Sequence, residues 1–465
     1  MIKHALRKIA LLFCAALLIF MTACASEKER PSPTYSAVKT AAPSISSSAV
    51  QTAAPSATLY PTTPSAGEHS AGAQLTPTYT AACSPSSTPT QTAEKTPSQY
   101  ESPYPSASSA ATAPSSASPS TVPSAESSIP MVSVSEIISK MTLEEKVGQM
   151  FMPRCPASDV KAYIEKYKPA GLVLYARDFK DKTAGQVRSE LTEYQQASDI
   201  PLLLSTDEEG GTVVRVSSNP KLHSHPFDAP QDIYREEGMT GLISDAREKS
   251  RLLLSLGINV NLAPVCDVSV NPNDYMYKRS MGLDASDTAK CIEQIVETMR
   301  KEGISSVLKH FPGYGGNLDT HTGIAVDERP YNQFVNQDFL PFISGIEAGA
   351  PGVLISHNIV KCMDETMPAS LSLEVHRILR EELGFNGVIM TDDLSMEAIK
   401  IYTNGNSPAV AAVLAGNDLL LTSDWQEDYS AVLEAVRAKV ISVSRIEESV
   451  KRVLLWKKEQ GLILA

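Results

Sequence analysis

The sequence predicts an α/β fold of the TIM (β/α)8 barrel class, preceded by a disordered Ser/Thr/Pro-rich spacer. Residues 131–465 alternate short apolar runs, typical of buried parallel strands, with amphipathic stretches, typical of helices. About eight such pairs in a segment of this length are characteristic of a TIM barrel, and an open doubly wound sheet is the alternative. No glycine-rich phosphate-binding loop follows an early apolar run, so no cofactor is expected.

The predicted elements follow one another in a regular order. A capping box formed by Thr142 and Glu145 predicts that a helix starts at Leu143. Eight strands are expected at Gly148–Met152, Gly171–Tyr175, Pro201–Thr206, Asn259–Val265, Ser305–Lys309, Gly352–Ser356, Gly387–Met390 and Asp418–Leu421. Helices are expected between them, for example at Ala289–Glu302, Leu373–Leu383 and Tyr429–Lys439.

Residues 1–23 have the features of a secretory signal. Three basic residues precede an apolar run over Ile9–Met21, which is shorter than the ~20 residues of a membrane-spanning helix. The run leads into Met21-Thr22-Ala23-Cys24, which resembles the lipobox of bacterial lipoproteins and implies that a lipid is attached to Cys24. We therefore expect an exported protein, lipid-anchored to the outer face of the cell membrane, within the cell wall. Signal cleavage next to an incidental cysteine is the alternative.

Composition indicates a linker and argues against one class of partner. Residues 24–130 consist mainly of Ser, Thr, Pro and Ala, and they cannot bury enough apolar surface to offset the entropy lost on ordering. We expect this linker to hold the globular part, residues 131–465, away from the membrane.

The formal net charge of −12 argues against nucleic acid as a partner.

Polar residues gather where the predicted strands end. They occur at Asp207–Gly211, Cys266-Asp267, Lys309–Gly313, His357-Asn358 and Asp392-Asp393. The carboxyl ends of the strands of a TIM barrel meet at one rim, so we expect these residues to lie together there. The His and Asp residues lack metal-ligand spacing, so no metal is expected. His357 either lines the pocket or is a core histidine with satisfied hydrogen bonds.

Five sequence motifs follow one another between residues 207 and 396. They are Asp207-Glu208-Glu209-Gly210-Gly211 with Arg215, Asn261–Asp267, Arg279–Gly282, Lys309–Gly315 followed by Asp319-Thr320-His321, and Thr391–Met396. In content and order they resemble glycoside hydrolase family 3, in particular its bacterial β-N-acetylhexosaminidase branch. The resemblance covers nearly the whole of residues 131–465 and implies the single-domain form of the family.

The resemblance implies catalytic roles for three residues. Asp392 matches the family nucleophile, which forms a covalent glycosyl-enzyme that water then hydrolyses with retention. Asp393 is then the cap of the following helix. His321 matches a histidine that acts as general acid and base, a task suited to a pKa near neutrality, and Asp319 would orient it. The alternative for Asp319 and His321 is a solvated turn, with Glu208 and Glu209 as other candidates for the acid.

Further positions match residues that hold the terminal N-acetylglucosamine. They are Asp207, Arg215, Arg279, Lys309 and His310. Carboxylates and cationic side chains bind sugar hydroxyls well. Gly210 and Gly211 are expected to let the backbone approach the sugar closely.

The expected function is that of a retaining exo-β-N-acetylglucosaminidase. Its partners would be carbohydrates, namely muropeptides or chitin-like N-acetylglucosaminides, and a membrane through the lipid anchor. One alternative is a β-glucosidase or β-xylosidase of the same family. Another is a non-catalytic lipoprotein that binds the cell wall.

Overall fold

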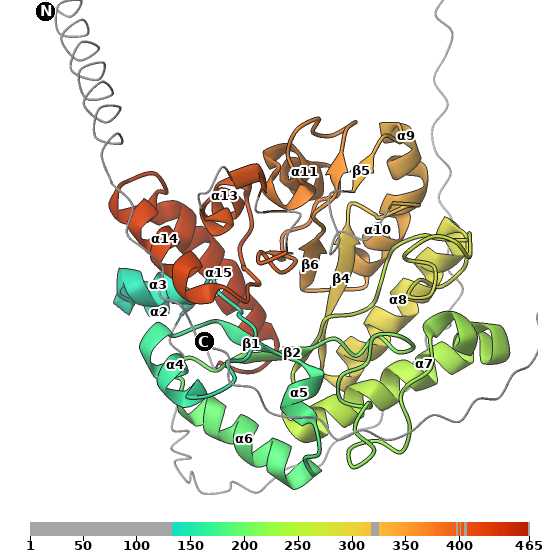
Figure 1. Cartoon of the computed structure of the whole chain (residues 1–465), viewed down its shortest axis with the longest axis horizontal. Coiled ribbons are helices and arrows are strands. Elements are labelled where there is room, and N and C mark those ends of the chain that lie inside the picture. Colours follow the sequence, from blue (N-terminus) through green and yellow to red (C-terminus); the bar gives the residue numbers. More distant parts are fainter. Residues whose placement is uncertain (1–132, 318–324, 397–398, 400, 404–406, 464–465) are drawn as a thin grey trace, which may run out of the picture. The chain divides into compact units, whose positions relative to one another are not determined.

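The computed structural model describes residues 133–317, 325–396, 399, 401–403 and 407–463 (Figure 1). The predicted signal, the lipid-bearing Cys24 and the spacer therefore lie outside the described residues. So do Asp319 and His321. The fold described below is that of the predicted globular part.

Six strands form one parallel sheet, whose order is β1-β2-β3-β4-β6-β8. They are β1 (Gly171–Leu174), β2 (Leu203–Thr206), β3 (Val260–Asn261), β4 (Ser305–Phe311), β6 (Gly352–Ile355) and β8 (Val388–Thr391). All pairs are parallel, for example Gly171 with Leu203 and Gly352 with Val388. A separate two-stranded sheet consists of β5 (Val326–Asp327) and β7 (Ile359–Val360). The prediction of an α/β fold with parallel strands is confirmed.

Two further segments continue the pairing from β8 to β1. Leu419 forms a parallel bridge with Met390 of β8, Leu420 pairs with Phe151, and Arg154 pairs with Val173 of β1. Strands were predicted in these two segments, but only isolated bridges form there. In the segment at residues 148–152 the expected strand is shortened at its beginning, because helix α3 (Leu143–Gly148) ends there. This helix starts at the predicted capping box.

Alternate residues of the strands pack into two different cores, as the period of two of a strand requires. On β4, Val307 belongs to an inner cluster and Leu308 to an outer one, and Val388 and Ile389 on β8 divide in the same way. The inner cluster collects one set of residues from all six strands, and the outer cluster packs against the helices. Such an arrangement is typical of a curved, TIM-like sheet with a filled interior.

Helices surround the strands in Figure 1. The longer ones are α4 (Val160–Tyr167), α6 (Ala184–Gln196), α7 (Pro230–Leu256), α8 (Ala285–Glu302), α10 (Phe339–Glu347), α13 (Pro408–Ala415), α14 (Trp425–Arg437) and α15 (Val443–Glu459). Shorter elements are α2 (Val134–Lys140), α5 (Ala176–Phe179), α9 (Tyr331–Gln333) and α11 (Leu373–Arg377). No helix among the described residues is long and apolar enough to cross a membrane.

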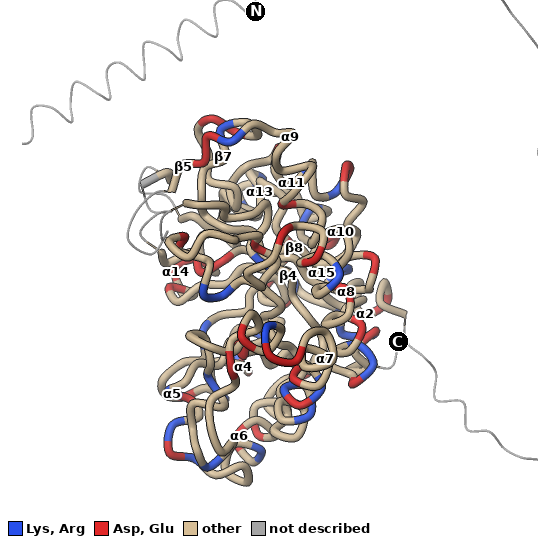
Figure 2. The backbone as a smooth tube through the Cα atoms, turned by 90° about the vertical axis from the view of Figure 1, so that its right-hand side faces the viewer, with Lys and Arg blue, Asp and Glu red and all other residues tan. Residues whose placement is uncertain are grey.

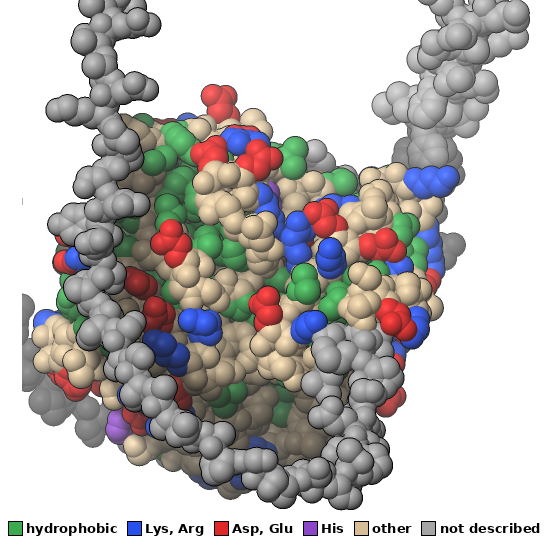
Figure 3. All heavy atoms as spheres, turned by 180° about the vertical axis from the view of Figure 1, so that it is seen from behind, with side chains coloured by type: hydrophobic (Ala, Val, Ile, Leu, Met, Phe, Trp, Pro, Cys, Tyr) green, Lys and Arg blue, Asp and Glu red, His purple; other side chains and the backbone are tan. Residues whose placement is uncertain are grey.

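Charged side chains of both signs are interspersed over the described elements. Figure 2 shows acidic and basic residues scattered along the backbone, and Figure 3 shows both kinds among apolar side chains on the face opposite to that of Figure 1. The excess of acidic residues in the sequence is thus spread over these views rather than gathered in one patch.

Candidate active site

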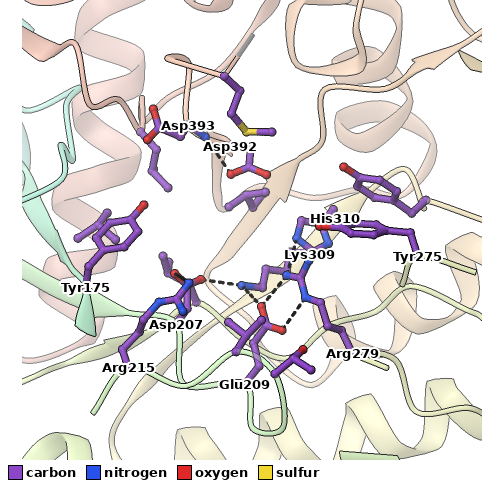
Figure 4. Close-up of a pocket in the computed structure, with 18 of the residues that line it drawn as sticks. Tyr175, Asp207, Glu209, Arg215, Tyr275, Arg279, Lys309, His310, Asp392 and Asp393 are labelled. Atoms are coloured by element: carbon purple, nitrogen blue, oxygen red, sulfur yellow. Dashed lines mark hydrogen bonds and ion pairs between the residues drawn. The ribbon is translucent and has the colours of Figure 1, made fainter. Parts of the chain in front are cut away.

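The carboxyl ends of the strands border a cavity of about 810 Å³. Six of the residues predicted for the site line it, namely Asp207, Arg215, Arg279, Lys309, His310 and Asp392. Lys309 and His310 belong to β4, whereas Asp207 and Asp392 directly follow β2 and β8. Because parallel strands end at the same edge, residues far apart in the sequence meet here (Figure 4). Their roles remain predictions, and a cavity of this size suits a small ligand.

A network of opposite charges holds the cationic side chains of the cavity (Figure 4). Lys309 Nζ lies 2.6 Å from Glu209 Oε1 and 2.8 Å from Asp207 Oδ1. Arg279 donates two hydrogen bonds to Glu209, from Nε to Oε2 at 2.9 Å and from Nη2 to Oε1 at 2.7 Å. Arg215 Nη2 lies 3.8 Å from Asp207 Oδ2. Glu209 therefore fixes two cations by its own two oxygens, and Asp207 lies between Lys309 and Arg215.

The charges within this network keep its members ionised despite burial. Burial acts to raise the pKa of Glu209, but Lys309 and Arg279 outweigh it and hold the pKa of that carboxyl well below its usual range. Burial acts to lower the pKa of Lys309, but Asp207 and Glu209 raise it above its ordinary value. A carboxylate held in this form cannot donate a proton at neutral pH. Glu209 is thus unsuited to be the general acid.

Asp267 fixes the ring of His310. Asp267 Oδ2 lies 2.7 Å from His310 Nδ1, and its Oδ1 accepts a hydrogen bond from the backbone N–H of Tyr314 at 2.8 Å. Asp267 is buried, and His310 Nε2 lies 3.3 Å from Arg279 Nη2. A carboxylate at Nδ1 favours the tautomer in which Nε2 accepts. The sequence predicts Asp267 at a strand end. It does not predict the contact with His310, because the two residues are 43 positions apart.

Asp392 and Asp393 are adjacent in the sequence but have different surroundings. Asp393 Oδ1 accepts hydrogen bonds from the backbone N–H groups of Ser395 and Ser423, both at 3.0 Å, and Oδ2 accepts one from Ser423 Oγ at 2.7 Å. The carboxylate of Asp392 accepts from the backbone N–H of Asp393 at 2.8 Å and lines the cavity. Both residues line the cavity, and the carboxylate of Asp393 is bound by Ser395 and Ser423. The assignment of Asp392 as nucleophile and of Asp393 as helix cap stays a prediction.

The surroundings of Asp392 favour its ionised form. Burial acts to raise its pKa, but His357, His310, the N–H of Asp393 and Lys309 together hold that pKa below the ordinary value of 3.8. The Asp392 carboxylate is therefore charged at neutral pH, as a nucleophile must be.

Glu208 and Gly210 support the loop after β2 rather than the cavity. Glu208 is buried, and its carboxylate accepts hydrogen bonds from the backbone N–H groups of Arg215, Val216 and Ser217. It is committed to holding this loop and is poorly placed for acid catalysis. Gly210 has φ +102°, and a Cβ atom there would lie 2.2 Å from the carbonyl oxygen of Asp228. A close approach of backbone to backbone therefore requires this glycine. The expected approach of Gly210 and Gly211 to a sugar stays a prediction.

His357 is a buried histidine with hydrogen-bond partners, the second of the two alternatives left open above. Its Nδ1 lies 2.8 Å from Ser370 Oγ, and its Nε2 lies 3.1 Å from the backbone oxygen of Asp393. Only 1% of His357 is exposed. It thus contacts the backbone of Asp393, just after β8.

Comparison with known proteins shows which family the described part of the chain resembles. The model of the glycosyl hydrolase family 3 N-terminal domain matches residues 142–455. The chain is 31% identical over 286 residues to β-hexosaminidase A of Pseudoalteromonas piscicida, and the match covers 57% of this chain and 47% of that protein. A family 3 β-N-acetylglucosaminidase from Paenibacillus sp. str. FPU-7 has 30% identity and a TM-score of 0.65, covering 69% of this chain and 63% of that one.

A third relative is matched over nearly its full length. It is the β-N-acetylhexosaminidase of Beutenbergia cavernae DSM 12333, with 28% identity and a TM-score of 0.62, covering 68% of this chain and 99% of that chain. By contrast, this chain spans about half of the Pseudoalteromonas protein and less than two thirds of the Paenibacillus protein.

Proposed function

This chain belongs to glycosyl hydrolase family 3, and on that basis we propose that it is a retaining exo-β-N-acetylglucosaminidase acting on peptidoglycan-derived or chitin-like sugars. The names of its bacterial relatives support the choice of N-acetylglucosamine. The observation that carries the proposal is the position of Asp392, ionised and facing a cavity that also presents Asp207 and Lys309.

The proposed reaction has two steps. Asp392 attacks the anomeric carbon, the bond to the leaving oxygen breaks, and a glycosyl-enzyme ester forms. Water then attacks the same carbon and releases both the sugar and the Asp392 carboxylate. His321, oriented by Asp319, would donate a proton to the leaving oxygen in the first step and accept one from water in the second.

Residues of the charged network would hold the terminal sugar. Asp207 can accept hydrogen bonds from sugar hydroxyls, while Lys309 and Arg215 can donate to them. Glu209 orients Lys309 and Arg279, so these cations need not reorganise when the sugar binds.

Two aryl glycosides test this function against its alternatives. We expect the full chain to hydrolyse p-nitrophenyl N-acetyl-β-glucosaminide, releasing the β-anomer first, with a much higher kcat/KM than for the corresponding β-glucoside or β-xyloside. Nuclear magnetic resonance of the first product gives the anomer, and p-nitrophenol absorbance gives the rates. A preference for the glucoside would favour the β-glucosidase alternative, and no turnover of any of these would favour a non-catalytic wall-binding protein.

We further propose that the protein is exported and anchored by a lipid on Cys24, with residues 24–130 as a linker to the enzyme. The support is the lipobox-like sequence at residues 21–24 and the composition that follows it. Cys24→Ser should abolish metabolic labelling with a radioactive fatty acid and release the enzyme from the membrane fraction. Membrane association of Cys24→Ser equal to that of the unaltered protein would contradict the anchor.

A further inference from the structure

Arg154 is a cationic residue of the cavity wall without an acidic partner among the described residues. It follows the segment that bridges to Leu420, and its backbone N–H donates to the carbonyl oxygen of Thr422 at 3.1 Å. Its side chain lines the cavity together with Thr422 and Ser423. Arg279 and Arg215, which line the same cavity, both face carboxylates. The guanidinium of Arg154 forms no such ion pair within the described part of the chain, and its Nε is buried without a hydrogen-bond partner there.

An aromatic ring fixes the Arg154 guanidinium. The ring of Tyr175 lies 4.4 Å from Arg154 Cζ and 5.6 Å from Arg215 Cζ, measured to its centroid. Figure 4 shows Tyr175 and Arg215 side by side on the cavity wall. Stacking on an aromatic face orients a guanidinium, and the two terminal Nη groups of an arginine form a planar fork that matches a carboxylate. A site is therefore built on this wall for one anionic group.

This wall adjoins the carboxylates that follow β8. The negative charges of Asp207, Asp393 and Asp392 all act on the Tyr175 hydroxyl and raise its pKa, after the larger effect of burial. The charge of Arg154 also acts to lower the pKa of Asp178, but Asp178 Oδ2 accepts a hydrogen bond from the backbone N–H of Tyr175 at 2.8 Å. Arg154 and Asp392 line the same cavity, so a saccharide bound with its anomeric carbon at Asp392 occupies a space that Arg154 also borders.

We propose that Arg154 binds a carboxylate carried by the part of the substrate next to the terminal N-acetylglucosamine, and that it sets the preference of the enzyme for acidic over neutral saccharides. The proposal rests on the proposed function, because the terminal N-acetylglucosamine is itself neutral and the carboxylate must then belong to its neighbour. In a wall-derived fragment this carboxylate comes either from the lactyl ether of a muramyl residue or from an attached peptide. Chitin-like fragments have neither.

A pair of disaccharides that differ only in this charge tests the proposal. The first is N-acetylglucosaminyl-N-acetylmuramic acid with a free lactyl carboxylate, and the second is its lactyl methylamide. A third substrate carries L-Ala-D-Glu on the lactyl group and so moves the carboxylates to the peptide. For the full chain we expect a kcat/KM about tenfold or more higher for one of the two acidic substrates than for the methylamide, as a charge-assisted hydrogen bond would give.

Arg154→Gln should bring that ratio close to one, and Arg154→Lys should retain part of it. Each variant is compared with its own rate on the methylamide, so a loss of folded protein cancels from the ratio. Lys278→Gln is the matched control, because Lys278 is another cation of the cavity wall whose loss changes the net charge equally. We expect its ratio to stay within about twofold of the unaltered protein.

Three outcomes would overturn the proposal while leaving the proposed function intact. They are equal rates on acidic and neutral disaccharides, an unchanged ratio in Arg154→Gln, and equal losses in Arg154→Gln and Lys278→Gln. Equal losses in the two variants would mean that the summed positive charge of the cavity, rather than Arg154 itself, attracts the acidic substrate. Failure to hydrolyse p-nitrophenyl N-acetyl-β-glucosaminide would instead contradict the proposed function itself.

Discussion

Asp392→Asn is expected to lower kcat/KM on p-nitrophenyl N-acetyl-β-glucosaminide by several orders of magnitude, roughly 10³-fold or more. Asparagine has nearly the same shape and can still accept the hydrogen bond from the N–H of Asp393, so the fold should persist. It lacks the negative charge that makes the side chain a nucleophile, and it cannot form the ester intermediate. Initial rates, together with circular dichroism and a thermal melt of the same preparation, give the result.

Asp393→Asn is the matched control for this variant. Its carboxylate accepts hydrogen bonds from Ser395 and Ser423, so its replacement should lower the melting temperature. Its effect on kcat in the folded protein should be much smaller than that of Asp392→Asn. A stable Asp393→Asn protein without activity, next to an active Asp392→Asn protein, would reverse the assignment.

The pH dependence of the rate should not reflect Asp392 near neutrality. The pKa of this carboxyl is held below its ordinary value of 3.8, so the nucleophile is ionised at pH 6 and above. An acidic limb of kcat/KM near pH 6 therefore has to come from another group. His321, as the general acid of the first step, must carry its proton, so its titration would place an alkaline limb of kcat/KM near the unperturbed histidine pKa of about 6.5.

His321→Ala is expected to slow the hydrolysis of substrates with poor leaving groups by roughly 10²- to 10⁴-fold, and of activated phenyl glycosides far less. An activated phenolate departs without a proton, whereas a sugar alkoxide does not. Deglycosylation should also slow, because water loses its base, and a burst of phenol should appear where glycosylation is faster. Rates across a series of aryl glycosides and one disaccharide measure the difference, and Asp319→Asn should show the same pattern more weakly.

Equal losses across that series would show that His321 does not act as the acid. The two other candidates from the sequence would not easily replace it. Glu208 is buried and bound by backbone N–H groups, and Glu209 is held ionised by Lys309 and Arg279. The contacts of Glu208 and Glu209 thus argue against both as the general acid, although His321 itself lies outside the described residues.

Much of the fold could be predicted because buried parallel strands leave continuous apolar runs. The runs at Gly171–Tyr175 and Gly352–Ser356 correspond to β1 and β6 with one residue of difference. The segments at residues 148–152 and 418–421 were harder, because their apolar character reflects burial and not regular pairing. A run of apolar residues indicates that a segment is inside the protein, but it does not show how many hydrogen bonds the segment forms.

The site was predictable where a motif contains the residue, and less so where only contacts reveal it. Lys309 and His310 were expected from their motif and the position of their strand. Asp267 was noticed only as a strand-end carboxylate, because its bond to His310 depends on the pairing of neighbouring strands. Arg154 gave no signal at all, since an arginine in an irregular segment is ordinary until Tyr175 and the cavity are placed beside it.

Covalent trapping of the glycosyl-enzyme tests the central claim most directly. A fluorinated N-acetylglucosaminyl fluoride, which slows the release of the sugar from the enzyme, is incubated with the full chain, and peptide mapping by mass spectrometry locates the added mass. We expect one equivalent of sugar on the peptide that contains Asp392, with fragment ions that assign it to that residue, and no labelling of Asp392→Asn. A sugar attached to Asp393, or full inactivation of catalysis without any covalent adduct, would contradict the account.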